Sequence, residues 1–92
     1  MHERDAERLS ILMLQIGAKL DESVAFVVDH DSESSAASYK RVVAELMASV
    51  HLDILERLWR DHPRLRPTQM NGSYAVDPLL YEPRFYSRGV VR

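Results

Sequence analysis

The chain contains no cysteine and only three glycines among its 92 residues. Without cysteine it has no disulfide, no thiolate zinc site and no cysteine nucleophile. Gly17, Gly72 and Gly89 are too scattered to form a phosphate-binding loop or a nucleophile elbow. The common signatures of nucleotide binding and of hydrolysis are therefore missing. We expect a protein without catalytic residues and without a cofactor.

The chain has four histidines, but they do not form a metal-binding pattern. His51 and His62 are eleven residues apart, which on a helix places them on one face but about 16 Å from each other. No histidine has the partner four residues away that an HExxH motif requires. We therefore predict no metal site and no enzymatic function.

Long hydrophobic runs are also missing. The longest mainly apolar stretch, Leu9 to Leu20, is interrupted by polar residues and is shorter than the roughly 20 apolar residues of a membrane span. The N-terminal sequence MHERDAERLS carries charges of both signs, unlike a secretory signal. We expect a cytoplasmic protein that makes no membrane contact.

What is present is an ordinary globular composition, with 46% hydrophobic residues, in a chain of the length of one domain. The formal net charge of −2 conceals an asymmetry. Residues 1–56 hold five basic and eleven acidic side chains, a net charge of −6, whereas residues 57–92 hold seven and three, a net charge of +4. Such charges usually cover solvated faces, but an arginine-rich end also suits an acidic or phosphate-bearing partner.

Two long amphipathic helices, at about residues 3–29 and 36–62, are predicted because apolar residues recur every three or four positions. Pro63 is expected to end the second helix, since proline disfavours helical geometry in the residue before it. The short polar connection between the helices favours an antiparallel hairpin over residues 1–62. The fold class predicted from the sequence is therefore all-α.

Two details of these helices are open at this stage. Ser34, Ser35 or Ser38 is suited to cap the start of the second helix, because a serine hydroxyl accepts a hydrogen bond from the first turn. The segment from Val24 to Val28 has a strand-like composition, which leaves a short strand as the alternative to continuous helix.

Each predicted helix carries a second apolar stripe opposite its main one. On the first helix the second stripe consists of Ile11, Leu14, Ala18 and Ala25. On the second helix it consists of Ala44, Ala48, Leu52, Leu55 and Trp59. A two-helix hairpin covers only one side of each helix, so the C-terminal segment, a second copy or both must cover the rest. We expect a homodimer in the form of a four-helix bundle.

The C-terminal segment, residues 63–92, is predicted to be an extended arm that packs on the hairpin or on a second subunit. Four prolines exclude a long helix, and Asn71-Gly72 predicts a tight turn. Several aromatic and aliphatic residues give the arm more apolar content than a disordered tail would have. Only Gly89 to Arg92 are expected to be frayed.

Trp59 is expected to be buried under the aromatic residues of the arm. In an antiparallel hairpin it lies at the open end, with Leu55 from its own helix and Ile11 or Leu14 from the first helix. Replacing a buried tryptophan by a small residue typically costs about 3–5 kcal/mol.

The sequence favours a non-catalytic protein-binding module, such as an adaptor, inhibitor, immunity factor or regulatory subunit, that binds another protein. Interfaces are enriched in arginine and aromatic residues. The candidate partner-binding residues share this chemistry and are Arg57, Trp59, Arg60, Arg64, Arg66, Tyr81, Phe85 and Tyr86. The alternative is nucleic-acid binding through the arginine cluster, which the acidic half and the sequence pI of about 6.0 disfavour.

Overall fold

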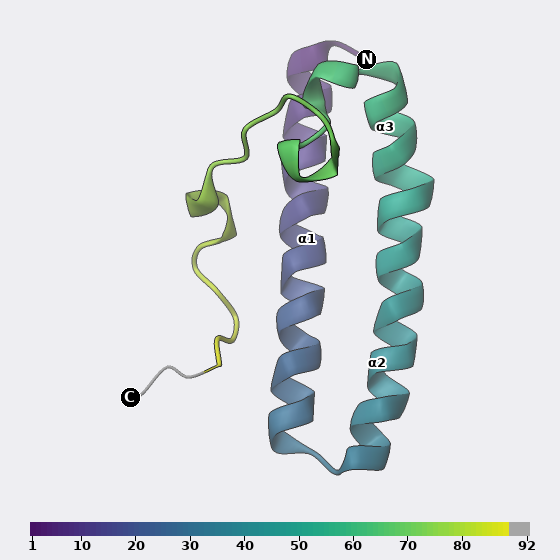
Figure 1. The fold of residues 1–92 in the computed structure, drawn as a ribbon, viewed down its shortest axis with the longest axis vertical. Helices are drawn as coiled ribbons and strands as arrows, with labels where there is room; N and C mark the ends of the chain where they lie inside the picture. The colour runs from purple at the N-terminus through teal and green to yellow at the C-terminus, as the bar shows by residue number, and fades with distance from the viewer. Residues whose placement is uncertain (89–92) are drawn as a thin grey trace.

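The computed structural model describes residues 1–88 and is all-α (Figure 1). The elements in chain order are α1 (Glu3–His30), α2 (Glu33–Ala48), the π-helix η1 (Ser49–Leu55), α3 (Glu56–Asp61) and the 3₁₀ turns η2 (Pro63–Leu65), η3 (Thr68–Met70) and η4 (Pro78–Tyr81). α1 and α2 pack antiparallel, which confirms the predicted hairpin. Within residues 1–88 no sheet forms, and the expected fraying of Gly89 to Arg92 lies outside the described residues.

The turn of the hairpin is shorter than predicted. Ser32 caps α2, and its hydroxyl accepts a hydrogen bond of 3.2 Å from the backbone N–H of Ser35. α2 therefore begins at Glu33, earlier than the serines considered from the sequence would allow. The strand alternative for residues 24–28 is wrong, because α1 continues without a break to His30.

α2, η1 and α3 form one continuous rod, and the π-helix decides which side chains of this rod face α1. At about 100° per residue, Val43 and Trp59 would point about 160° apart in a regular α-helix. In a π-helix the backbone hydrogen bonds join residues i and i+5, and each turn takes more residues than in an α-helix. Side chains four positions apart in η1 therefore point in nearly the same direction. Val43, Leu55 and Trp59 are all buried as a result.

The predicted second stripe of this helix is therefore wrong in its last part. Leu55 and Trp59 belong to the face that packs on α1, whereas Ala44, Ala48 and Leu52 are exposed. The error came from assuming a regular α-helical pitch throughout, which rotates every residue beyond Ser49 to the wrong side.

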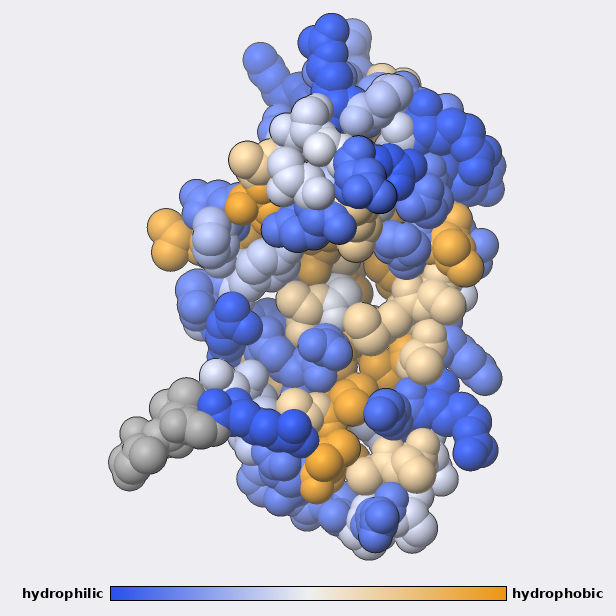
Figure 2. Space-filling view, in the orientation of Figure 1, coloured by the Kyte–Doolittle hydropathy of each residue, from blue (hydrophilic) through white to orange (hydrophobic). Residues whose placement is uncertain are grey.

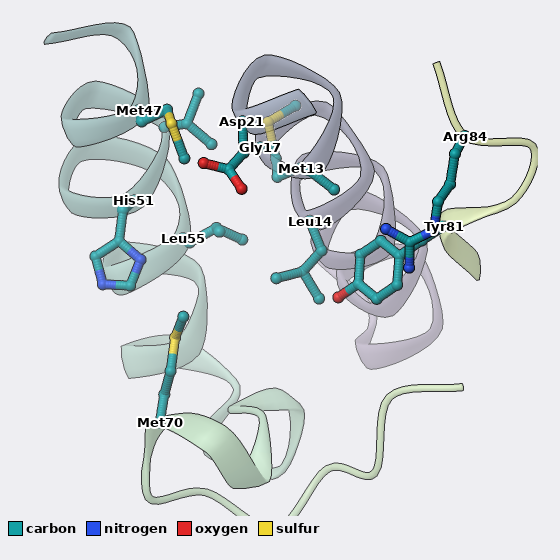
Figure 3. A pocket seen from close by; sticks show the side chains of 12 residues that line it. Met13, Leu14, Gly17, Asp21, Met47, His51, Leu55, Met70, Tyr81 and Arg84 are labelled. Carbon is teal, nitrogen blue, oxygen red and sulfur yellow. The ribbon is translucent and has the colours of Figure 1, made fainter. Parts of the chain in front are cut away.

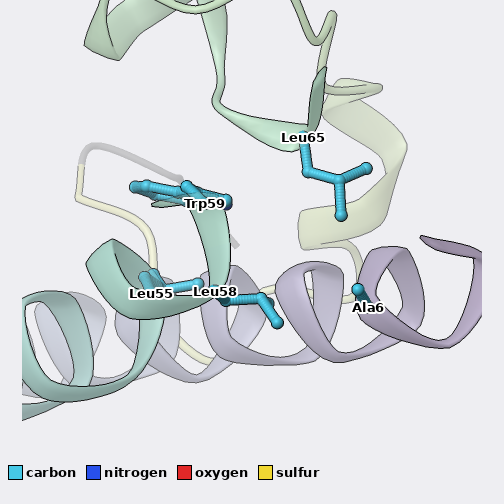
Figure 4. Packing of buried hydrophobic residues seen from close by; sticks show 5 residues of the cluster. All are labelled: Ala6, Leu55, Leu58, Trp59 and Leu65. Carbon is cyan, nitrogen blue, oxygen red and sulfur yellow. The ribbon is translucent and has the colours of Figure 1, made fainter. Parts of the chain in front are cut away.

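The main hydrophobic core lies at the open end of the hairpin (Figure 4). Its members come from α1, η1, α3 and η2 and are Ala6, Leu55, Leu58, Trp59 and Leu65. Trp59 is only 1% exposed, and Leu14 and Tyr74 pack against the same cluster. The predicted burial of Trp59 is confirmed.

The predicted turn at Asn71-Gly72 is also present. Asn71 has a φ of 64°, in the left-handed region, and Gly72 follows it. A Cβ atom on Gly72 would lie 1.9 Å from the carbonyl oxygen of Arg66, so only glycine fits there. The turn brings Tyr74 back beside Pro67, and the Tyr74 hydroxyl donates a hydrogen bond of 2.7 Å to Glu7.

From this point the arm runs along α1, on the side away from α2 (Figure 1). Polar side chains of α1 bind its backbone. Gln15 donates a hydrogen bond of 2.8 Å to the carbonyl of Leu80, and Lys19 donates one to the carbonyl of Pro83. The four residues of the predicted second stripe of α1 are half-buried. Leu14 packs against the core and, together with Ala18, lines the groove described below.

The arm, α1 and the α2 rod lie side by side in one layer. The radius of gyration is 15.0 Å, and the extents are 44 × 29 × 21 Å. A compact domain of this length would have a radius of gyration of about 12 Å. A single layer leaves two broad faces, and these faces carry the surfaces described below.

No helix in the described part of the chain has both the length and the hydropathy needed to cross a lipid bilayer.

Candidate protein-binding surfaces

Of the predicted binding residues, Trp59 and Arg66 have structural roles. The Trp59 indole Nε1 donates a hydrogen bond of 2.9 Å to the hydroxyl of buried Ser10. The Arg66 guanidinium lies 5.4 Å from the centre of the Trp59 ring and forms two hydrogen bonds, of 3.0 and 2.9 Å, to the Glu56 carboxylate. The hydrogen bond from Arg66 lowers the pKa of Glu56, and the same contact raises the pKa of Arg66. A tryptophan enclosed in this way is not accessible to a partner or to a nucleic-acid base.

Arg57, Arg60 and Arg64 are exposed at the open end of the hairpin, where α3 and η2 meet. Within residues 1–88 none of the three forms an ion pair. They are the part of the predicted arginine cluster that remains accessible.

The aromatic residues of the arm lie away from these arginines. Phe85 and Tyr86 pack near the turn of the hairpin, each with its ring centre 5.3 Å from that of Phe26. Tyr81 is half-buried midway along α1. The structure therefore does not bring the eight predicted residues together, because the arm runs from the open end of the hairpin to its turn.

The end of the arm is fastened to α1 by buried and charged groups. Glu22, which is 8% exposed, accepts hydrogen bonds of 2.5 and 3.0 Å from the backbone N–H groups of Phe85 and Tyr86. Asp29 accepts a hydrogen bond of 2.6 Å from the Tyr86 hydroxyl and others from Arg88. The hydrogen bonds from Arg88 and Tyr86 lower the pKa of Asp29, and the bond to Asp29 raises the pKa of Tyr86.

One broad face of the hairpin carries exposed aliphatic side chains from both helices. The Tyr39 hydroxyl donates a hydrogen bond of 2.8 Å to Ser23, which joins one side of α2 to one side of α1. Leu46 is seven residues after Tyr39, and Leu12 is eleven residues before Ser23, so both lie on this face. Because η1 takes more residues per turn, Ile54 remains in line with Leu46.

We call this set the apolar strip. It consists of Leu12, Val42, Leu46 and Ile54, which are 38–57% exposed. These residues belong to the apolar periodicity that predicts the two helices. They are outside the core because α1 and the α2 rod meet along one narrow line.

The opposite face holds a groove of about 530 Å³ that lies between the α2 rod and α1 and continues across α1 to Tyr81 and Arg84 of the arm (Figure 3). Asp21 is on this side, because two residues on α1 place it about 200° from Ser23. Figure 2 shows apolar side chains gathered along the seam between the helices. The lining includes three methionines from three elements, together with glycine and polar groups: Met13, Met47, Met70, Gly17, Asp21, His51, Tyr81 and Arg84. We call it the methionine groove.

Gly17 lies in the wall of this groove. A Cβ atom at this position would meet nothing within 4 Å, so no contact inside the described chain requires glycine. Glycine in a helix interior costs about 1 kcal/mol relative to alanine. The sequence places this glycine inside the first predicted helix, but only the structure shows that the missing side chain leaves space in a groove.

The described residues contain no group of three or more His, Asp or Glu side chains placed to hold a metal ion. Comparison with known protein families, curated proteins and solved structures finds no match to this chain.

Proposed function

We propose that this protein is a small non-catalytic protein-binding module that acts as a homodimer. The observation that carries the proposal is the apolar strip, in which four large aliphatic side chains lie exposed on one face of a two-helix layer. Exposed apolar patches of this kind mark interaction surfaces, since water solvates them poorly.

The amount of exposed surface supports a second copy as the occupant of the strip. The accessible surface is 6728 Å², whereas a compact monomer of 10.6 kDa exposes about 5,500 Å². The excess is larger than the roughly 800 Å² that each partner buries in a standard interface. Because the strip includes residues of α1 and of the α2 rod, two copies packed face to face on it form a four-helix bundle.

The strip replaces the surface that the sequence suggested for dimerisation. The second stripe of α1 is half-buried within one chain, and Leu55 and Trp59 are in the core. Leu12 and Leu46, by contrast, are 47% and 49% exposed.

The test compares two leucines of the same rod. Leu46 belongs to the strip, whereas Leu52 is 60% exposed on another side of η1. We expect light scattering of the parent protein to give a dimer, and Leu46→Glu to raise the dimer dissociation constant at least about 100-fold, because a carboxylate would be buried. Leu52→Glu should leave the dimer intact.

A parent protein that stays monomeric at micromolar concentrations would refute the homodimer, and so would equal weakening by both substitutions. Circular dichroism of each variant checks that the helices are retained. If the homodimer is refuted in this way, the apolar strip is available only to a different protein, and the four-helix bundle must be abandoned.

The exposed arginines at the open end are the second element of the proposal. Arg57, Arg60 and Arg64 would lie at the ends of the dimer, accessible to an acidic partner. Titration with short DNA and RNA at two salt concentrations tests the nucleic-acid alternative. Micromolar affinity that falls steeply with salt would favour that alternative, because phosphate contacts release counterions.

A further inference from the structure

We infer that the methionine groove binds a basic amphipathic helix of a partner protein. The inference rests on the proposed protein-binding function, but it uses the face opposite the apolar strip. Three observations support it: the composition of the lining, the open space at Gly17 and the charge of Asp21.

The lining suits an apolar helix face of variable shape. Met13, Met47 and Met70 come from α1, α2 and η3, so they surround the groove from different directions (Figure 3). Methionine is unbranched and polarisable, and methionine-rich surfaces adapt to different apolar side chains. A groove between two helices is also a common seat for the apolar face of a third helix.

The walls are formed by two locally unfavourable pieces of helix. Gly17 gives α1 a gap in its side-chain surface, since nothing within the described chain occupies the space beside it. Across the groove, Val50, His51 and Leu55 belong to the π-helix. π-Helices are rare and are found frequently at functional sites. A partner side chain inserted beside Gly17 would fill the space that α1 leaves open.

The charges at the groove select the sign of the partner. His51 lies 3.5 Å from Glu56, and Arg84 lies 3.4 Å from Glu82, so these two groups have acidic neighbours already. No ion pair within residues 1–88 involves Asp21, and its carboxylate is directed into the groove (Figure 3). An apolar helix that carries lysine or arginine beside its apolar face matches this arrangement.

The experiment uses a fluorescently labelled model peptide of about 16 residues, long enough for a stable helix once bound. Leucines at helical spacing form one face, and lysines fill the rest. Two matched peptides serve as controls: one with glutamate in place of lysine, and one with the lysine peptide's composition in scrambled order. Anisotropy of the label reports binding to the full-length protein.

We expect micromolar binding of the lysine peptide only. Gly17→Leu should weaken binding at least about tenfold by filling the groove, while the chain becomes more resistant to urea because a helix-breaking glycine is removed. Asp21→Asn should weaken binding and reduce its salt dependence. Asp53→Asn, an exposed carboxylate outside the groove, should do neither.

The two proposals fail separately. Leu46→Glu should disrupt the dimer but keep peptide binding. Gly17→Leu should keep the dimer but weaken peptide binding. Peptide binding that Gly17→Leu and Asp21→Asn both leave unchanged would overturn the groove inference, whatever the oligomeric state. Equal binding of the scrambled or the glutamate peptide would overturn it as well, because it would show adhesion without a helix face or without the expected charge.

Discussion

Trp59 donates a hydrogen bond of 2.9 Å to Ser10, although 49 residues separate the two in the chain. Both side chains are buried, at 1% and 3% exposed. The bond joins α3 to α1 at the open end of the hairpin and satisfies the indole N–H inside the hydrophobic core. It therefore fixes the register of the two helices at the end where no covalent turn joins them.

Ser10→Ala should destabilise the protein by about 1–3 kcal/mol, because it leaves the Trp59 N–H buried without an acceptor. Urea denaturation followed by tryptophan fluorescence measures the loss. Ser38→Ala, at an exposed position of α2, is the matched control and should change the free energy of unfolding by no more than about 0.5 kcal/mol. A Ser10→Ala protein as stable as the parent would show that the indole N–H finds water instead.

Deletion of Leu52 should be tolerated. The residue is exposed in η1, and removal of one residue there allows the π-helix to become regular α-helix. Val43 and Trp59 would then be fifteen residues apart and about 60° apart around the rod, still on one side.

Deletion of Leu12, which is also exposed but lies in regular α1, should unfold the chain, because it rotates the rest of that helix by about 100°. Melting curves followed by circular dichroism compare the two deletions. If deletion of Leu52 lowered the melting temperature as much as deletion of Leu12, the role of η1 in keeping Val43 and Trp59 on one side of the rod would be refuted.

The hydrophobic periodicity of the sequence was sufficient to predict the two helices and their antiparallel packing. It was not sufficient to predict the π-helix, because a change from i→i+4 to i→i+5 bonding leaves no composition of its own in Ser49–Leu55. That single departure moved Leu55 and Trp59 from a supposed second surface into the core.

The route of the arm could not be predicted for a different reason. Gln15, Lys19 and Glu22 are polar residues of an amphipathic helix, and most such residues face solvent. In the structure they bind backbone groups of the arm, which hydrophobic patterning does not register. Their spacing along one line of α1 was the available evidence, but it did not identify the segment they hold.

Glu22→Ala should release the end of the arm. The carboxylate accepts two backbone N–H groups, at Phe85 and Tyr86, so its removal leaves both donors without a partner. Trypsin should then cleave after Arg84 and Arg88 several-fold faster, as followed by mass spectrometry. Asp21→Ala, at the exposed neighbouring position, is the control and should not alter the cleavage rate.

Acid should loosen the same end of the arm. Because Arg88 and Tyr86 hold the pKa of Asp29 below its ordinary value of 3.8, the folded state binds this proton less readily than the unfolded state. The stability that ionised Asp29 contributes is therefore complete at pH values above the ordinary pKa, and it is lost as the pH falls through the lowered pKa. The NMR signals of the Tyr86 ring should shift in this range, and Asp29→Asn should abolish the transition.

Alkali should weaken the same end of the arm by ionising Tyr86, whose hydroxyl donates a hydrogen bond to Asp29. The hydrogen bond to Asp29 raises the pKa of Tyr86, and the bond to Glu7 raises that of Tyr74, both above the ordinary value of 10.0. The stability that these two hydroxyls contribute to the folded state is fully present at pH values below the ordinary pKa. It is lost as the pH rises through the raised pKa values. Tyrosinate absorbance should show at least two of the tyrosines titrating late, and Asp29→Asn should bring one of them back toward the ordinary value.

The position of α1 between α2 and the arm has a consequence for the order of synthesis. Within residues 1–88, every side-chain hydrogen bond between α1 and the arm joins residues that are 57 to 67 positions apart. A growing chain that has released α1 and α2 from the ribosome still lacks the arm partners of Glu7, Gln15 and Glu22. The first helix to be made is thus the last to receive all its partners, and a chain that ends before Tyr74 would lack every one of these hydrogen bonds to α1.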